Sequence, residues 1–224
     1  MTKKIAVLLL CFAVSLPLLA EDKVTKRIAD STAVLQGVLS KNEIPKNVLN
    51  KAVCVIVFPS VKKVGIGLGM SYGRGVMTCR SGSSMTGAWS APAMYSLDTG
   101  SLGAQLGGTA TDFVLLVMNP QAAGKALMGK LKLGADASAT AGPSSASAGT
   151  YDEKADILSY SQAKGLFAGA SLGTASMSSD DGANKELYGK DLTAAQIVRD
   201  GAVPVNAAGK PLVSLLTQYS PKHM

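Results

Sequence analysis

The sequence predicts an α+β fold, with a mainly antiparallel, glycine-rich sheet and flanking helices in a single compact domain. Strand patterns dominate the middle of the chain, whereas helix patterns flank both ends. Gly65, Gly67 and Gly69 alternate with apolar residues at the strand period, which leaves one bare face against which another element packs closely. Aromatic residues make up only 5% of the chain against 47% hydrophobic residues, so Gly, Ala and Ser must fill much of the interior.

The first twenty residues are typical of a secretory signal. Lys3 and Lys4 form a basic start, an apolar stretch follows, and cleavage is expected after Ala20. An uncleaved anchor is the alternative, which the short apolar stretch disfavours. We therefore expect a signal peptide over residues 1–20, one domain over residues 21–224, and a periplasmic or secreted location.

The first helix is expected over Lys23–Leu39, because its apolar residues fall on one stripe. A short helix over Lys46–Lys51 and a buried strand over Ala52–Phe58 should follow, since the strand is a continuous apolar run rich in β-branched residues. Beyond the glycine alternation, further strands are predicted over Val76–Arg80, Ala88–Ser96, Leu102–Leu106 and Thr111–Met118.

The second half continues this mixture of helices and strands. Asn119-Pro120 predicts the start of a helix over Gln121–Leu131. The small residues of Ala135–Thr150 fit either a closely packed strand or loop, or a flexible linker. The remaining predictions are a strand pair over Ile157–Ser161 and Leu166–Leu172, a polar loop over Ser178–Gly189, a short helix from Thr193 to Arg199, and a closing helix over Pro211–Tyr219.

No motif in the chain predicts catalysis, a cofactor or a metal. The glycines lack dinucleotide-binding spacing, and neither a P-loop nor a GxSxG motif occurs. His223 is the only histidine and lies in the tail, so no serine–histidine pair or zinc site is expected. Asp112 is expected to bind nearby backbone amides, and Asp180-Asp181-Gly182 lacks the alternation of a calcium loop.

Charge and cysteine content leave several interpretations open. The formal net charge is +7, which fits an anionic partner but also an ordinary soluble protein. Nucleic acid is not an expected partner, because the aromatic residues lie in apolar strand patterns. Cys54 and Cys79 form either one disulfide or two buried thiols. The first helix either covers its own core or lies on an anionic bilayer, and the two roles are compatible.

Several separated motifs, in order, closely resemble the SYLF domain family of lipid-binding proteins. The resemblance extends over about residues 25–220. It is carried by Phe58-Pro59-Ser60-Val61-Lys62-Lys63, Gly73-Arg74-Gly75-Val76, Trp89-Ser90-Ala91-Pro92, Gly103-Ala104-Gln105-Leu106-Gly107, Asp112-Phe113-Val114-Leu115, Gly142-Pro143, Ser159-Tyr160-Ser161, Lys164-Gly165-Leu166-Phe167-Ala168-Gly169 and Tyr188-Gly189.

The resemblance implies a compact α+β domain that binds phospholipids, with phosphoinositides preferred by eukaryotic members, some of which also bind actin. A basic amphipathic first helix contributes to membrane binding in that family, which implies Lys23, Lys26 and Arg27 as lipid-binding residues here. Our own charge analysis adds Lys62, Lys63, Arg74 and Arg80, and shallow membrane insertion is predicted for Val24, Ile28 and Leu35.

Two departures from the family alter these expectations. Ser144-Ser145-Ala146 follows Gly142-Pro143 where many relatives have a Gly-Arg pair, so a positive charge is missing from a candidate ligand loop. The predicted export signal would also separate the chain from actin, which is therefore not an expected partner. The sequence thus predicts an exported, non-enzymatic domain that binds anionic phospholipids at membranes, and the alternative is a structural or protein-binding module of the envelope.

Overall fold

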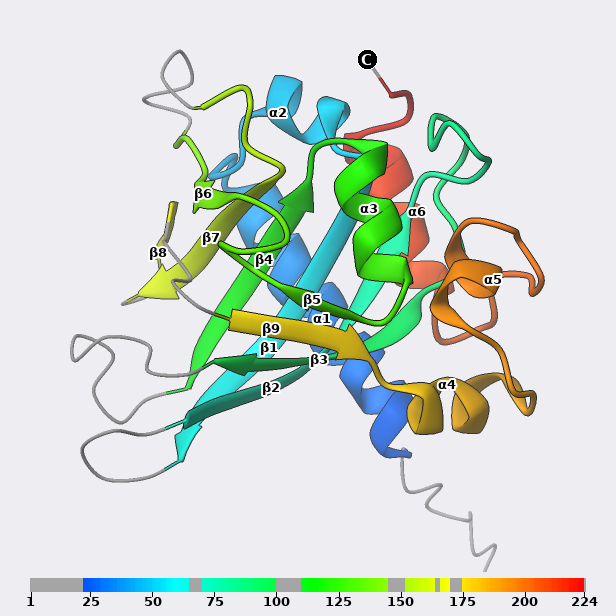
Figure 1. Cartoon of the computed structure of the whole chain (residues 1–224). Helices are drawn as coiled ribbons and strands as arrows, with labels where there is room; N and C mark the ends of the chain where they lie inside the picture. Colours follow the sequence, from blue (N-terminus) through cyan, green and yellow to red (C-terminus); the bar gives the residue numbers. More distant parts are fainter. Residues whose placement is uncertain are drawn as a thin grey trace, which may run out of the picture.

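The computed structural model describes residues 22–64, 70–99, 110–144, 152–163, 166–169 and 175–223, which form six helices and nine strands (Figure 1). The helices are α1 (Lys23–Ser40), α2 (Lys46–Lys51), α3 (Pro120–Leu127), α4 (Asp181–Tyr188), α5 (Ala194–Val198) and α6 (Lys210–Tyr219). The strands are β1 (Cys54–Val64), β2 (Met70–Cys79), β3 (Ala93–Thr99), β4 (Thr111–Val117), β5 (Lys130–Lys132), β6 (Ala139–Ala141), β7 (Ile157–Ala163), β8 (Leu166–Gly169) and β9 (Ala175–Ser179).

All nine described strands belong to one sheet. Its order is β5-β9-β3-β2-β1-β4-β7-β6, and β8 pairs with β7 beside this path. Among these described strands, only the short β6–β7 pair is parallel. The predicted α+β class with a mainly antiparallel sheet is therefore confirmed. The predicted signal, the glycine alternation at 65–69 and the strand at 102–106 lie outside the described residues.

Helices cover both faces of the sheet (Figure 1). Along β1, Val55 and Val57 join a buried cluster with residues of α1, α2 and α6. Ile56 and Phe58 belong to a second cluster that includes α3 and α5. Side chains alternate between the two faces of a strand, so a strand that is buried on both faces must be apolar at successive positions. This explains the continuous apolar run from which β1 was predicted.

A bulge carries β1 beyond its predicted end at Phe58. The pairing of β1 with β2 shifts register between Val57 and Lys62, and Ser60 has a φ of 51°. The backbone N–H of Ser60 donates to Oδ1 of Asp112 at 2.7 Å, so Asp112 binds a backbone amide as expected. The bulge includes Pro59, which has no N–H to donate and is therefore tolerated at such a position.

Two predicted segments have different structures. The helix expected over Gln121–Leu131 ends at Leu127, because Gly129 turns with a φ of 127° and the following residues pair with β9 as β5. The loop expected over Ser178–Gly189 contains the helix α4. Its ends carry recognisable signals, an Asp180 N-cap and a left-handed Gly189, which the polar composition between them obscured.

The described part of the small-residue segment is closely packed rather than a linker. Strand β6 pairs with β7, and Gly142 then lies directly against the ring of Tyr160. The Tyr160 hydroxyl donates to the carbonyl oxygen of Pro143 at 3.1 Å. The Gly142-Pro143 motif therefore closes this end of the sheet over a buried tyrosine.

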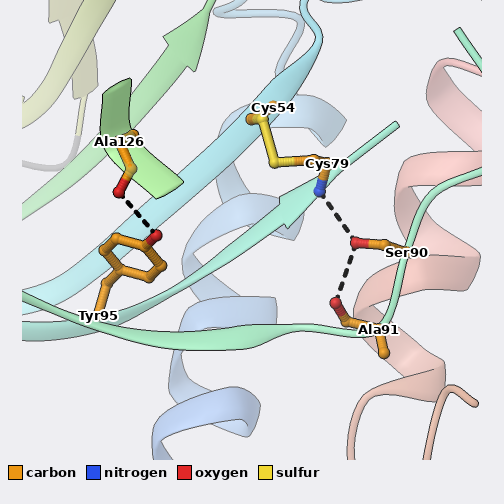
Figure 2. The surroundings of a disulfide bond; sticks show 6 residues. All are labelled: Cys54, Cys79, Ser90, Ala91, Tyr95 and Ala126. Atoms are coloured by element: carbon orange, nitrogen blue, oxygen red, sulfur yellow. Dashed lines mark hydrogen bonds between the residues drawn. A yellow bond between two sulfur atoms is a disulfide. The ribbon is translucent and has the colours of Figure 1, made fainter. Parts of the chain in front are cut away.

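Cys54 and Cys79 are directly opposite on β1 and β2 and are joined by a disulfide (Figure 2). Both residues are fully buried. The backbone N–H of Cys79 also donates to the Ser90 hydroxyl oxygen at 3.2 Å, which ties the end of β2 to the segment before β3. The sequence left open whether these cysteines form a disulfide or remain two buried thiols, and in the structure they form the disulfide.

Candidate functional site

A groove of about 790 Å³ opens beside the first turns of α1. Its walls come from α1, the bulged end of β1, the facing part of β2 and the start of α4. Five of the seven predicted lipid-binding residues line it, namely Lys23, Lys26, Arg27, Lys62 and Arg74.

The start of α1 sets the position of its basic residues. Asp22 is the N-cap, and one of its carboxylate oxygens accepts the backbone N–H of Thr25 at 2.6 Å. This bond and that from the Thr25 hydroxyl lower the pKa of Asp22. The cap fixes where the helix begins, so Lys23 and Lys26 lie in its first turns on the groove side.

Lys23 and Lys62 are two of the exposed cations of the groove. Lys62 follows the β1 bulge, whose shifted register and bond to Asp112 set its place at the rim. Neither lysine forms an ion pair within the described residues. Lys26 lies beside them and pairs with Asp30 at 2.7 Å along the helix.

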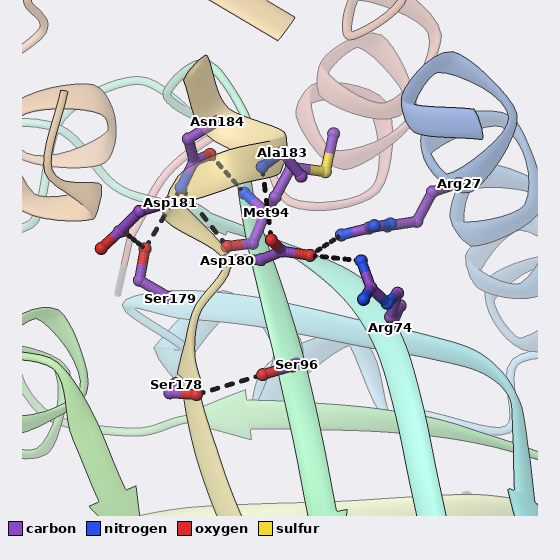
Figure 3. Close-up of polar contacts among 10 residues, drawn as sticks. All are labelled: Arg27, Arg74, Met94, Ser96, Ser178, Ser179, Asp180, Asp181, Ala183 and Asn184. Carbon is purple, nitrogen blue, oxygen red and sulfur yellow. Dashed lines mark hydrogen bonds and ion pairs between the residues drawn. The ribbon is translucent and has the colours of Figure 1, made fainter. Parts of the chain in front are cut away.

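Two arginines of the groove converge on one carboxylate (Figure 3). Oδ2 of Asp180 lies 2.9 Å from Nη1 of Arg27 and 3.0 Å from Nη1 of Arg74. Arg74 also lies over the ring of Tyr72, with its Cζ atom 5.4 Å from the ring centroid. Asp180 was not among the predicted site residues, although its place before Ala183 and Asn184 is a helix-capping signal.

The residues predicted to insert into a membrane belong to the core. Val24, Ile28 and Leu35 are at most 2% exposed and pack in the cluster between α1 and the sheet. Burying this stripe stabilises the domain, and exposing it to lipid would require α1 to leave the sheet. The insertion prediction is therefore wrong for this conformation, and α1 covers its own core.

Arg80 is a structural residue rather than a groove residue, which corrects its predicted role. It is 1% exposed, and its Cζ atom lies 4.1 Å from the ring centroid of Trp89. Its Nη2 donates to the carbonyl oxygen of Ser220 at 2.7 Å, and Trp89 Nε1 donates to the same oxygen at 2.9 Å. Burial lowers the pKa of the Arg80 guanidinium. The side chain of Lys63 lies outside what the structure describes.

Other kinds of site find no support in the described ranges. No cluster of three or more His, Cys, Asp or Glu side chains there is arranged to hold a metal ion. None of the described helices combines the length and the apolar character needed to cross a bilayer. The basic groove is therefore the candidate site of this domain.

Comparison with known proteins identifies the family. A family model named Ysc84 and described as "Las17-binding protein actin regulator" matches residues 98–219, more than half of the chain. The chain belongs to the Ysc84 family. This confirms the resemblance to SYLF domains found in the sequence. The residues matched by the Ysc84 model include Asp180 and the whole of α4, whereas Arg27 and Arg74 precede them.

Several yeast proteins are similar to this Ysc84 domain. An SH3 domain-containing protein of Schizosaccharomyces pombe is 36% identical over 77% of this chain and 40% of its own length. Protein YSC84 of Saccharomyces cerevisiae is 32% identical over 77% of this chain and 37% of its own. LAS seventeen-binding protein 3 of the same species is 33% identical over the same share of this chain and 38% of its own. The chain thus spans about two fifths of the length of these relatives.

Proposed function

We propose that this domain binds anionic phospholipids at a membrane surface, with the groove beside α1 as the contact for head groups. The observation that supports the proposal most is the convergence of five basic residues from three separate segments on one groove. Lys23 and Lys62 project there without an ion-pair partner among the described residues. Each such charge contributes about 1 kcal/mol near an anionic surface.

The proposed contact is electrostatic and peripheral. The apolar stripe of α1 stays in the core, so the domain would rest on the head groups without inserting this helix. We further propose that the protein is exported and acts without catalysis, with phosphatidylglycerol or cardiolipin as its ligand class. The predicted signal at residues 1–20 supports the export, and the absence of any catalytic motif in the sequence supports a binding role.

Charge reversal at the groove tests this proposal. Lys23→Glu and Lys62→Glu should each weaken co-sedimentation with phosphatidylglycerol-containing vesicles by at least about five-fold, because each replaces an attractive charge with a repulsive one. Lys154→Glu is the matched control, since Lys154 is exposed and outside the groove. Equal binding by all four proteins would rule out the groove as the lipid contact.

Protein binding is the second candidate function. It is favoured by the family description and by the name of LAS seventeen-binding protein 3, which attribute Las17 binding to relatives. Those relatives are more than twice as long as the part that this chain matches, so their partners need not depend on this domain. Co-sedimentation with purified actin filaments, and pull-down with purified Las17, each run alongside the vesicles, separate the two candidates. We expect the protein to co-sediment with the vesicles and not with the actin filaments.

A further inference from the structure

Asp180 holds an unusual position for an acidic residue in a basic groove. Its Oδ2 atom accepts from Arg27 and Arg74 at 2.9 and 3.0 Å, so one oxygen joins two guanidinium groups (Figure 3). A phosphate oxygen commonly makes the same contact with an arginine pair. The carboxylate therefore occupies a position that suits an anionic ligand.

This carboxylate is held in place by its surroundings. Oδ1 of Asp180 caps α4 by accepting from the backbone N–H of Ala183 at 3.3 Å, and the Asp180 N–H donates to the Met94 oxygen at 2.9 Å. One turn later the fully buried Asn184 accepts from the Met94 N–H at 2.7 Å and donates to the Ser179 hydroxyl at 3.1 Å. The start of α4 is thus fixed to β3 and β9.

The two arginines differ in their freedom to move. The Arg27 side chain is 8% exposed, whereas that of Arg74 is 54% exposed and faces the groove. If Arg74 turned toward a ligand, Asp180 would keep its pair with Arg27 and its capping bond. Leaving a buried charge without a partner costs several kcal/mol of folding free energy, and this movement of Arg74 would leave none.

We propose that Asp180 restrains anion binding in the groove. In this mechanism, which rests on the proposed function, a phospholipid phosphate binds by drawing Arg74 away from Asp180, while Arg27 stays paired. The fixed carboxylate competes with the ligand for Arg74 and sets the affinity of the site. Asp180 is thus a specificity-determining residue that limits binding to surfaces with enough anionic charge to overcome it.

The first experiment removes the charge of Asp180 and keeps its shape. Asp180→Asn should bind phosphatidylglycerol-containing vesicles about five-fold more tightly than the wild type, because it releases Arg74 to the phosphate and one such charge contributes about 1 kcal/mol near an anionic surface. Asn is an equally good N-cap, so α4 should persist. Circular dichroism at the assay temperature checks that the variant is folded.

Three controls separate charge from disruption. Asp180→Glu keeps the charge and should bind within about two-fold of the wild type. Glu153→Gln makes the same change in net charge at an exposed residue outside the groove, and should leave binding unchanged. In an Arg74→Gln background, Asp180→Asn should give no gain. A gain that persists without Arg74, or that Asp180→Glu also produces, would overturn the proposal.

A measurement on the unaltered protein does not depend on how the variants fold. With arginine side chains labelled with 15N, the Arg74 Nε resonance should shift when phosphatidylglycerol-containing nanodiscs are added, while that of Arg27 stays in place. Equal shifts of both resonances, or none, would overturn the mechanism. If the wild type binds vesicles and Asp180→Asn binds no tighter, only this proposal falls. If neither binds, the proposed lipid function falls with it.

Discussion

Gly142 lies so close to the ring of Tyr160 that no side chain fits between them. A Cβ atom at Gly142 would meet the Cζ, Cε2 and hydroxyl oxygen atoms of Tyr160 far inside contact distance. The ring cannot easily move away, because it is fully buried and its hydroxyl donates to the Pro143 oxygen at 3.1 Å. A glycine is therefore required here for space rather than for backbone conformation.

Gly142→Ala should lower the free energy of unfolding by about 1–3 kcal/mol, the usual cost of overpacking a buried contact. Urea denaturation measures it. Gly124→Ala is the matched control, because Gly124 lies in α3 with open space around it. That change should raise the free energy of unfolding by up to about 1 kcal/mol, since alanine favours the helix. Equal effects of the two substitutions would contradict the steric explanation.

Individual charges in this chain are easy to find in the sequence, but the sequence does not show which of them are exposed. Lys23 follows a helix cap and Lys62 lies near the end of β1, so local signals help to place both at the groove, whereas Arg74 lies within β2. Arg80 looks similar in the sequence, yet its main partner is Ser220, far away along the chain. Pairing across such a separation depends on tertiary packing, which no local pattern encodes.

At the scale of elements, the disulfide links the two central strands of the sheet. Cys54 and Cys79 are 25 residues apart, so the bond closes a loop of moderate length in the unfolded chain. Loop closure of this kind stabilises a folded domain by about 2–4 kcal/mol. The bond therefore holds together β1 and β2, the two strands that also border the groove.

The Cys54→Ala/Cys79→Ala double variant should unfold at lower urea concentration, with a free energy of unfolding reduced by about 2–4 kcal/mol. The wild type unfolded and refolded in reductant should behave in the same way, whereas reductant should not affect the double variant. A thiol count on the unreduced, unfolded wild type that finds reactive groups at both Cys54 and Cys79, in addition to any thiol of Cys11, would contradict the bond.

Helix ends were predictable where the capping residues stood next to an apolar pattern. Thr193 caps α5 as expected, and its backbone N–H donates in return to the side-chain oxygen of Gln196. α4 was missed because its sequence, DGANKELY, has little apolar character, and it is held instead by the buried Asn184. A single buried polar side chain that binds a neighbouring strand leaves almost no periodic signal in the sequence.

At the scale of the whole molecule, the basic excess predicts how binding responds to salt. The formal net charge is +7, and the apolar stripe of α1 is buried in the core. Attraction to an anionic surface should therefore be screened as ionic strength rises, since the Debye length falls to about 8 Å at physiological salt.

Raising sodium chloride should release the protein from phosphatidylglycerol-containing vesicles, and neutral phosphatidylcholine vesicles should not bind it at any salt concentration. Flotation of the vesicles on a density gradient measures both. Binding that persists at high salt, or that is equal on neutral vesicles, would mean that apolar contacts dominate and that α1 or another segment inserts.

The contact between α1 and α6 also affects how the chain reaches its folded state. Leu35 and Val38 of α1 share one cluster with Leu212 and Leu216 of α6, although the two helices lie at opposite ends of the described chain. During synthesis α1 leaves the ribosome long before α6 exists. The part of this cluster that α6 covers therefore stays open until the last helix emerges, and the nascent domain exposes apolar surface of the kind that chaperones bind.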